Sequence, residues 1–328
     1  MSPTIRNHIL FPLWGNPAVP LFLIIQVFHS YKKGLGNVSV NFGKLWKRVI
    51  SPFVMVHFII TFLYLTENLL KGNFEKDIIL GQILGHHGGK GVGSYYPLIH
   101  VQFAILLPIW APLFRRLSRK TIAIIFLLFS QMIEILCCWL SIPDLLYHLS
   151  FLRYTFLFYL GYVLVFYGYN LNRWTLALSI ISMGSILFFA YSGVSLSPIF
   201  YNKSWNLCHW ICYFFPCYLL LYALKKVYNV LLRCKKVISL SCLIGKYSYE
   251  IFLFQMVYFL FIERIVESGI SFIPNYYTQR ILLILFSVVI CIFPVVFYKK
   301  CTLKYKKARL ETKESTLCDE TKKQLETR

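Results

Sequence analysis

The sequence predicts an all-α, polytopic membrane protein, a bundle of about nine transmembrane helices. First, 58% of its 328 residues are hydrophobic and only 14% are charged. A soluble domain of this size cannot cover so much apolar surface with water-compatible groups. Second, the apolar residues form separate runs close to the roughly 20 residues that span a bilayer as a helix. Third, these runs are continuous rather than alternating, which favours helices over the strands of a barrel.

In chain order, the predicted spans are 17–31, 49–69, 94–113, 121–141, 150–169, 174–193, 207–225, 247–263 and 279–298. We assign residues 1–302 to one membrane-embedded domain. Residues 303–328 mix Lys, Glu and Thr with few apolar residues, so they have little from which to build a core. They are predicted to form a polar, mobile tail.

The net charge of +21 falls on every second connection between the spans. This alternation is typical of a membrane topology signal rather than of a nucleic-acid-binding surface, and we expect no nucleic-acid partner. The positive-inside rule places the basic connections in the cytoplasm, the N-terminus outside and the C-terminus inside. The cations concerned include Lys32, Lys33, Lys44, Lys47, Arg48, Arg115, Arg116, Arg119, Lys120, Lys225, Lys226, Arg233, Lys235, Lys236, Lys246, Lys299 and Lys300.

The ten cysteines show no spacing typical of a disulfide framework. Cys208, His209 and Cys212 lie within about one helical turn and have residue types that can ligate a metal. Small, polarizable side chains in a helix core explain the same pattern. We therefore predict no metal site.

Polar side chains inside a span are costly in hydrocarbon, so they need partners or a function. Glu134 could accept a proton, bind a substrate hydroxyl or pair with a cation. Arg153, at the start of its span, could bind an acceptor or anchor the helix at the interface. His57 and His100 could each be a general base or a hydrogen-bonded packing residue. Gln102 follows His100 by two residues and is expected on a different side of the helix.

Lys44, Lys47 and Arg48 recur at three to four residues before the second span. On a helix they share one face at the predicted cytoplasmic edge. Such a face can bind the phosphates of a cytosolic donor. It can equally mark topology and contact lipid headgroups, and both interpretations stay open.

Three segments together resemble the membrane-bound acyltransferase 3 family. AVPLFLIIQ over 18–26, followed by KRVISP over 47–52, is similar to the second helix of the family and its Arg-x-x-x-Pro entry to the third. GSYY over 93–96 is similar to a second motif. IGKYSYEIFLFQ over 244–255 is similar to the late GxxSxxIYLxH helix. The chain departs from the family at Ile25-Gln26, where many members have Ser-Gly, and at Gln255, where many have His.

The resemblance implies an integral O-acyltransferase of the bacterial cytoplasmic (inner) membrane. It would move an acyl group, expected to be acetyl, from acyl-CoA to a hydroxyl of a polysaccharide or lipid-linked glycan. Acyl-CoA would be a cosubstrate, with no permanently bound cofactor. The candidate residues are His57, His100 and Glu134 for catalysis, Lys44, Lys47 and Arg48 for the donor, and Tyr95, Tyr96, Gln102 and Arg153 for the acceptor.

One element of the family pattern is not found before Ala18, namely a first helix with a cation and a histidine proposed as the base. On this ground weak or no activity is expected, and a non-catalytic, truncated family member is an alternative. Another alternative is a glycan transporter or flippase. Transporters are typically built from repeated halves with broken helices near the midplane, and the sequence shows no internal repeat. The third alternative is a non-catalytic partner of a polysaccharide synthase.

Overall fold

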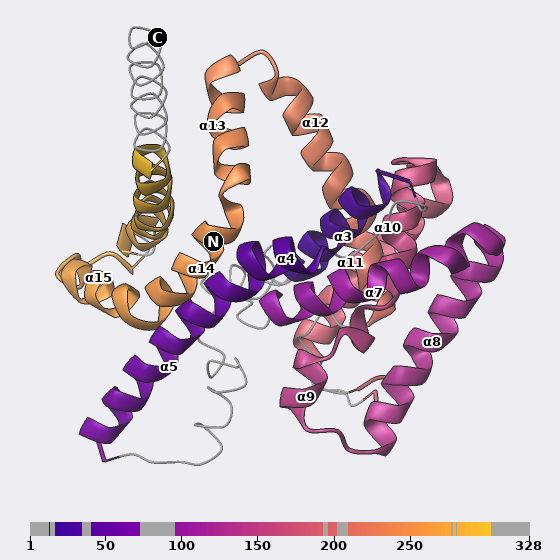
Figure 1. Cartoon of the computed structure of the whole chain (residues 1–328), viewed down its shortest axis with the longest axis horizontal. Coiled ribbons are helices and arrows are strands. Elements are labelled where there is room, and N and C mark those ends of the chain that lie inside the picture. Colours follow the sequence, from indigo (N-terminus) through magenta and orange to yellow (C-terminus); the bar gives the residue numbers. More distant parts are fainter. Residues whose placement is uncertain are drawn as a thin grey trace, which may run out of the picture. The chain divides into compact units, whose positions relative to one another are not determined.

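The computed structural model describes residues 13, 17–34, 41–72, 96–192, 196–201, 209–276, 278–279 and 281–302. Within this part of the chain every regular element is a helix. The chain folds as two compact units, Met1–Arg233 and Cys234–Arg328 (Figure 1). The predicted tail, 303–328, lies outside the described residues.

Six helices among the described residues are long and apolar enough to cross a membrane. They are Phe42–Leu70, Tyr96–Arg116, Arg119–Trp139, Arg173–Tyr191, Trp210–Leu231 and Ile281–Thr302. Each corresponds to a predicted span. The protein is therefore an all-α, multi-pass membrane protein.

The predicted number of nine membrane helices is not confirmed. The predicted spans 17–31 and 150–169 are shorter apolar helices, Ala18–Tyr31 and Phe151–Tyr167. The first has 14 residues, fewer than the roughly 20 that a helix perpendicular to the bilayer needs. The predicted span 247–263 lies in a helical run that does not combine the length, hydropathy and low charge of a membrane helix.

The first unit is built around one almost fully buried helix, α10. Eight of its twelve residues are buried, and it packs against α3, α7 and α8. The elements of this unit are α3 (Ala18–Tyr31), α4 (Phe42–Leu45), η3 (Trp46–Ile50), α5 (Ser51–Leu70), α7 (Tyr96–Arg116), α8 (Arg119–Trp139), α9 (Asp144–Leu149), η4 (Phe151–Tyr154), α10 (Phe156–Tyr167), α11 (Arg173–Tyr191), η5 (Trp210–Tyr213), η6 (Phe215–Leu220) and α12 (Leu221–Leu231).

The tightest helix contact of this unit joins α3 to α10 at Gly161. A Cβ atom added to Gly161 would lie 2.3 Å from Cγ1 of Val27. Leu23, Ile24 and Val27 on the facing side of α3 are fully buried. In lipid, helices gain little from excluding water, so close approach at small residues is what holds them together. Gly161 therefore sets the distance between α3 and α10.

Aromatic rings join the four helices α3, α7, α8 and α10 of this unit. Phe114 of α7 stacks on Phe126 of α8 with centroids 5.4 Å apart, and on Tyr162 of α10 at 4.7 Å. Tyr31 of α3 meets the edge of Phe114 at 5.4 Å. Phe158 stacks on Phe103 at 4.2 Å. Each such pair adds about 0.5–1.5 kcal/mol beyond its buried area.

Side-chain caps explain where several of these helices begin. Ser118 accepts a hydrogen bond from the Thr121 amide at the start of α8, at 3.2 Å. Asn172 does the same for Thr175 at the start of α11, at 2.9 Å. Arg119 and Arg173 follow these caps, although a cation is unfavourable near the positive end of a helix dipole. Helix stability therefore does not explain their placement.

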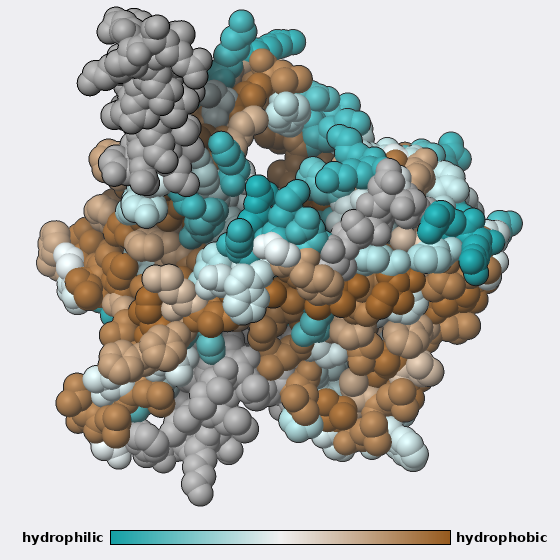
Figure 2. Space-filling view, viewed as in Figure 1, coloured by the Kyte–Doolittle hydropathy of each residue, from teal (hydrophilic) through white to brown (hydrophobic). Residues whose placement is uncertain are grey.

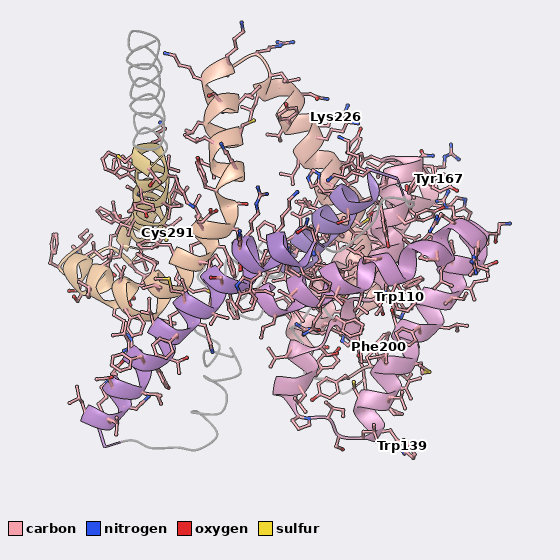
Figure 3. All side chains as sticks on the ribbon, viewed as in Figure 1. Trp110, Trp139, Tyr167, Phe200, Lys226 and Cys291 are labelled. Atoms are coloured by element: carbon pink, nitrogen blue, oxygen red, sulfur yellow. The ribbon has the colours of Figure 1, made fainter. Side chains whose placement is uncertain are left out.

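Basic side chains gather at one end of the first unit, called here the basic end. Arg119 lies over the Tyr167 ring at 4.2 Å, and Lys225 lies over the Tyr169 ring at 5.3 Å. The start of α8 and the basic part of α12 therefore lie near the end of α10. Over the first unit, Figure 2 shows hydrophilic residues along the upper edge and hydrophobic residues below them. Figure 3 places Lys226 and Tyr167 at one end of the unit and Trp139 at the other. Arg119, Lys225 and Lys226, which belong to different basic connections of the sequence, thus lie at one end of the first unit.

The second unit has its own apolar cluster and polar contacts between its helices. Its elements are α13 (Lys235–Lys246), α14 (Ser248–Val257), η7 (Tyr258–Ile262), α15 (Glu263–Ile270) and the helix Ile281–Thr302. Tyr247, Ile251, Tyr258 and Cys291 form the buried cluster. Ser287 donates a hydrogen bond to the Tyr258 hydroxyl at 2.8 Å. Lys299 pairs with Glu250 at 2.8 Å.

Replacing Gly161 with Ala should lower the thermal unfolding midpoint of the detergent-solubilised protein. The added methyl group overlaps Val27, and overpacking of this kind costs about 1–3 kcal/mol. The double variant Gly161→Ala/Val27→Ala should regain stability relative to Gly161→Ala alone. Gly184→Ala is the matched control, because its Cβ would meet open space on α11. An equal loss for both glycine variants would contradict the assignment.

Candidate functional site

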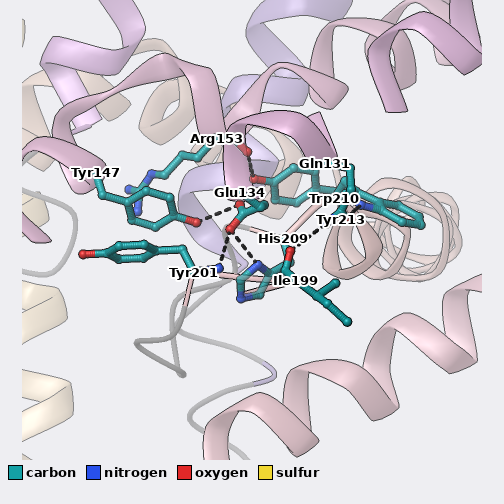
Figure 4. Close-up of polar contacts among 9 residues, drawn as sticks. All are labelled: Gln131, Glu134, Tyr147, Arg153, Ile199, Tyr201, His209, Trp210 and Tyr213. Carbon is teal, nitrogen blue, oxygen red and sulfur yellow. Dashed lines mark hydrogen bonds and ion pairs between the residues drawn. The ribbon is translucent and has the colours of Figure 1, made fainter. Parts of the chain in front are cut away.

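Glu134 is buried in the second half of α8, with 1% of its surface exposed. Its carboxylate accepts two hydrogen bonds (Figure 4). The Tyr147 hydroxyl on α9 donates to Oε1 at 2.8 Å. The Tyr201 amide donates to Oε2 at 3.0 Å. Donors to both oxygens stabilise the ionised carboxylate, which would otherwise be costly in an apolar surrounding.

His209, which precedes η5, faces the same carboxylate. Its Nδ1 lies 3.3 Å from Oε2 of Glu134, and 3% of the residue is exposed. The ring N–H is not aligned for a hydrogen bond, so the contact is an electrostatic one at ion-pair distance. The rings of Phe189 and Phe200 enclose the imidazole at 4.6 and 4.7 Å. The carboxylate and the imidazole are thus held together in an apolar enclosure.

Arg153 of η4 approaches this pair through a tyrosine. Its guanidinium lies 5.5 Å from the centre of the Tyr147 ring, whose hydroxyl binds Glu134. It also lies over the Tyr154 ring at 4.4 Å and donates a hydrogen bond to the Tyr154 hydroxyl at 2.6 Å. The Tyr213 hydroxyl donates to the Arg153 carbonyl. Arg153 is 1% exposed, so it is not a side chain that reaches out to the interface.

We call Glu134, Tyr147, Arg153, Tyr201 and His209 the Glu134 cluster. Four separate segments of the first unit contribute to it: α8, the α9–η4 region, residues 196–201 and the residues before η5. Glu134 lies fifteen residues after Arg119, about 22 Å along the axis of α8. The cluster therefore lies far from the basic end along α8.

The two predicted histidines are outside this cluster. His100 of α7 has its Nδ1 3.2 Å from the Tyr96 hydroxyl, and its carbonyl accepts a hydrogen bond from Gln26 of α3 at 2.9 Å. His57 of α5 stacks on Phe53 with centroids 5.5 Å apart. Their contacts with neighbouring side chains fit the packing interpretation as well as the catalytic one.

The other predicted site residues that the structure describes occupy two different places. Gln102 ties α7 to the entry of η4: its Nε2 donates to the Leu149 carbonyl at 3.0 Å, and its Oε1 accepts from the Phe151 amide at 2.9 Å. These bonds position the turn that carries Arg153. Lys44, Lys47 and Arg48 are exposed at the start of the long helix Phe42–Leu70, where η3 forms a π-helical turn. Tyr95 lies outside the described residues.

Sequence reasoning missed three members of the cluster, Tyr147, Tyr201 and His209. His209 was noticed only beside Cys208 and Cys212, as a possible metal ligand. Cys212 packs in an apolar cluster with Ile186, Phe189 and Phe215. No group of three metal-ligating side chains occurs among the described residues, of which Cys208 is not one. The signal that could have identified His209 was its position inside the predicted span 207–225, the same signal that singled out His57 and His100.

A carboxylate facing one imidazole nitrogen has a defined chemical use. It stabilises the imidazolium that forms when Nε2 takes a proton. Enclosure in an apolar surrounding strengthens this electrostatic effect. The Glu134–His209 pair can therefore act as a general base toward a hydroxyl or other weak acid.

Comparison with known proteins gives this chain no relative: no family model, no curated protein and no solved structure matches it. The interpretation of the site therefore depends on the residues of this chain alone. The resemblance to the membrane-bound acyltransferase 3 family stays a prediction from short motifs.

A double-mutant cycle should detect the contact between Glu134 and His209. Glu134→Gln and His209→Gln should each lower the free energy of unfolding in detergent micelles. Removing both should cost less than the sum, with a coupling of about 1 kcal/mol, since charged residues in contact rarely act additively. The cycle of Glu134→Gln with His57→Gln serves as control and should be additive. Additivity in both cycles would show that Glu134 and His209 do not interact.

Proposed function

We propose that this protein is an integral-membrane acyltransferase that moves an acyl group, expected to be acetyl, from acyl-CoA to a hydroxyl of a polysaccharide or lipid-linked glycan. The observation that carries the proposal is the buried Glu134–His209 pair, 3.3 Å apart and far from the basic end. The motif resemblance supplies the reaction class. The pair supplies what that reaction needs, a general base within the membrane domain.

In this reaction, His209 takes the proton of the acceptor hydroxyl at Nε2 while Glu134 stabilises the charged ring. The hydroxyl oxygen forms a bond to the thioester carbonyl carbon, and the carbon–sulfur bond breaks. The proton passes from His209 to the departing CoA thiolate, so atoms and charge balance. Tyr147 and Tyr201 keep the carboxylate in place through their bonds to Oε1 and Oε2. Arg153 positions the Tyr147 ring.

The donor is proposed to enter from the side marked by cations. Lys44, Lys47 and Arg48 are exposed and offer three positive charges to the phosphates of CoA. By the positive-inside rule we propose that this side is the cytoplasm, and the family resemblance implies a bacterial inner membrane. The acceptor would then meet the Glu134 cluster from the opposite face, where glycans are assembled or exported. His57 and His100 are the alternative candidates for the base, and Tyr95, Tyr96 and Gln102 are proposed to bind the acceptor.

Acyl transfer can be measured directly with radiolabelled acetyl-CoA in bacterial membrane vesicles that contain lipid-linked glycan. The wild-type chain should transfer label to the glycan fraction and release CoA thiol. Glu134→Gln and His209→Gln should each lower kcat by about 10²–10⁴, the range for a lost general base. His57→Gln and His100→Gln are matched controls and should have smaller effects.

The same assay separates the proposal from its rivals. Loss of transfer in His57→Gln or His100→Gln, with His209→Gln unaffected, would move the base to that histidine. A wild-type chain that transfers no label under any condition would favour a glycan transporter or a non-catalytic protein.

Arg48→Ala should weaken binding of acetyl-CoA about fivefold, the effect of losing about 1 kcal/mol from one exposed charge contact. Isothermal titration of the detergent-solubilised protein would measure the dissociation constant. Arg173→Ala is the matched control, because Arg173 is an equally exposed arginine at the start of another helix. Equal binding by both variants and the wild type would remove Arg48 from the donor site.

A further inference from the structure

Gln131 is not a member of the Glu134 cluster, but its side chain contacts the two chain segments that carry Tyr201 and His209. Gln131 lies three residues before Glu134 on α8, so the two side chains share a helix face. Its Nε2 donates a hydrogen bond to the Ile199 carbonyl at 2.6 Å. Its Oε1 accepts a hydrogen bond from the indole Nε1 of Trp210 at 2.9 Å (Figure 4).

Each of these two partners is close in sequence to a residue that contacts the Glu134 carboxylate. Ile199 precedes Tyr201 by two residues, and the Tyr201 amide donates to Oε2 of Glu134. Trp210 directly follows His209, whose Nδ1 faces the same oxygen at 3.3 Å. Residues 196–201 and 209–213 belong to no common helix, so their own secondary structure does not align them. The primary amide of Gln131 provides one donor and one acceptor at fixed geometry, which suits it to hold both.

We propose that Gln131 is the positioning residue of the Glu134–His209 pair. It fixes residues 196–201 through its donor and the His209-Trp210 segment through its acceptor, and so brings the Tyr201 amide and the imidazole to the same carboxylate oxygen. It does not touch the reacting atoms. Its consequence for acyl transfer rests on the proposed function, whereas its effect on the contact between Glu134 and His209 does not.

The two bonds can be removed one at a time. Gln131→Glu keeps an acceptor for Trp210 but replaces the donor to Ile199 with an oxygen that repels the carbonyl. Trp210→Phe keeps the bond to Ile199 and removes the indole donor. The first variant should release mainly the Tyr201 contact, and the second mainly the His209 contact. Gln131→Leu removes both bonds at similar side-chain volume.

The decisive measurement is the Glu134→Gln/His209→Gln double-mutant cycle repeated in altered backgrounds. In the Gln131→Leu and Trp210→Phe backgrounds the coupling between Glu134 and His209 should be lost. In the Gln131→Glu background it should persist, because the bond to Trp210 remains. A residue with a merely structural role would lower the unfolding midpoint without changing this coupling.

Gln102→Leu provides the matched control. Gln102 is also an amide with one donated and one accepted bond between segments, but its partners are Leu149 and Phe151. It should lower the unfolding midpoint and leave the Glu134–His209 coupling intact. Coupling that survives in Gln131→Leu, or that Gln102→Leu abolishes equally, would overturn the proposal.

Activity adds a separate readout. If the wild type transfers acetyl groups, Gln131→Leu should lower kcat with little change in KM for acetyl-CoA, since donor contacts are elsewhere. If the wild type transfers none, the proposed function fails while the coupling experiment still decides the role of Gln131. An activity loss in Gln131→Leu with unchanged coupling would also overturn the positioning role.

Discussion

The buried carboxylate of Glu134 imposes the strictest constraint on this structure. Hydrocarbon offers no water to a charged group, so the protein itself must supply every partner. A tyrosine hydroxyl, a backbone amide and an imidazole do so from three segments that are far apart in sequence. Those segments include irregular backbone, which is tolerated in an apolar surrounding only when it is enclosed by protein. Glu134 therefore organises the part of the first unit that lies away from the basic end.

The basic end obeys a different constraint. Its cations remain exposed or lie over aromatic rings, as Arg119 does over Tyr167, and they need no buried partner. Arg119 and Arg173 occupy helix N-termini, where the helix dipole disfavours them, so helix stability does not explain their placement. The two ends are joined by apolar and aromatic packing around α10, with Gly161 admitting α3 at close range. This arrangement keeps exposed charge and buried charge about 22 Å apart along α8.

That separation has a consequence for the proposed reaction. A donor held by its phosphates near Lys44, Lys47 and Arg48 must extend its thioester toward the Glu134 cluster, and an acceptor must arrive from the other face. A general base enclosed by Phe189 and Phe200 is shielded from bulk water, which would otherwise compete with the acceptor for the acyl group. Binding of the donor and catalysis would thus be performed at opposite ends of one helical unit.

The sequence by itself determined the membrane class, most of the helix positions and the clustering of cations between apolar runs. Hydropathy and charge are properties of short stretches of sequence, and they decide directly which stretches enter lipid. It also singled out Glu134 and Arg153, since a charge within an apolar run is conspicuous. It overestimated the number of full-length spans, because apolar composition does not show whether a short helix such as α3 reaches across the bilayer. Only the tertiary structure decided the partners of Glu134. Tyr147, Tyr201 and His209 lie 13 to 75 positions away, and such pairing depends on how helices pack, a property that no local pattern of residues encodes.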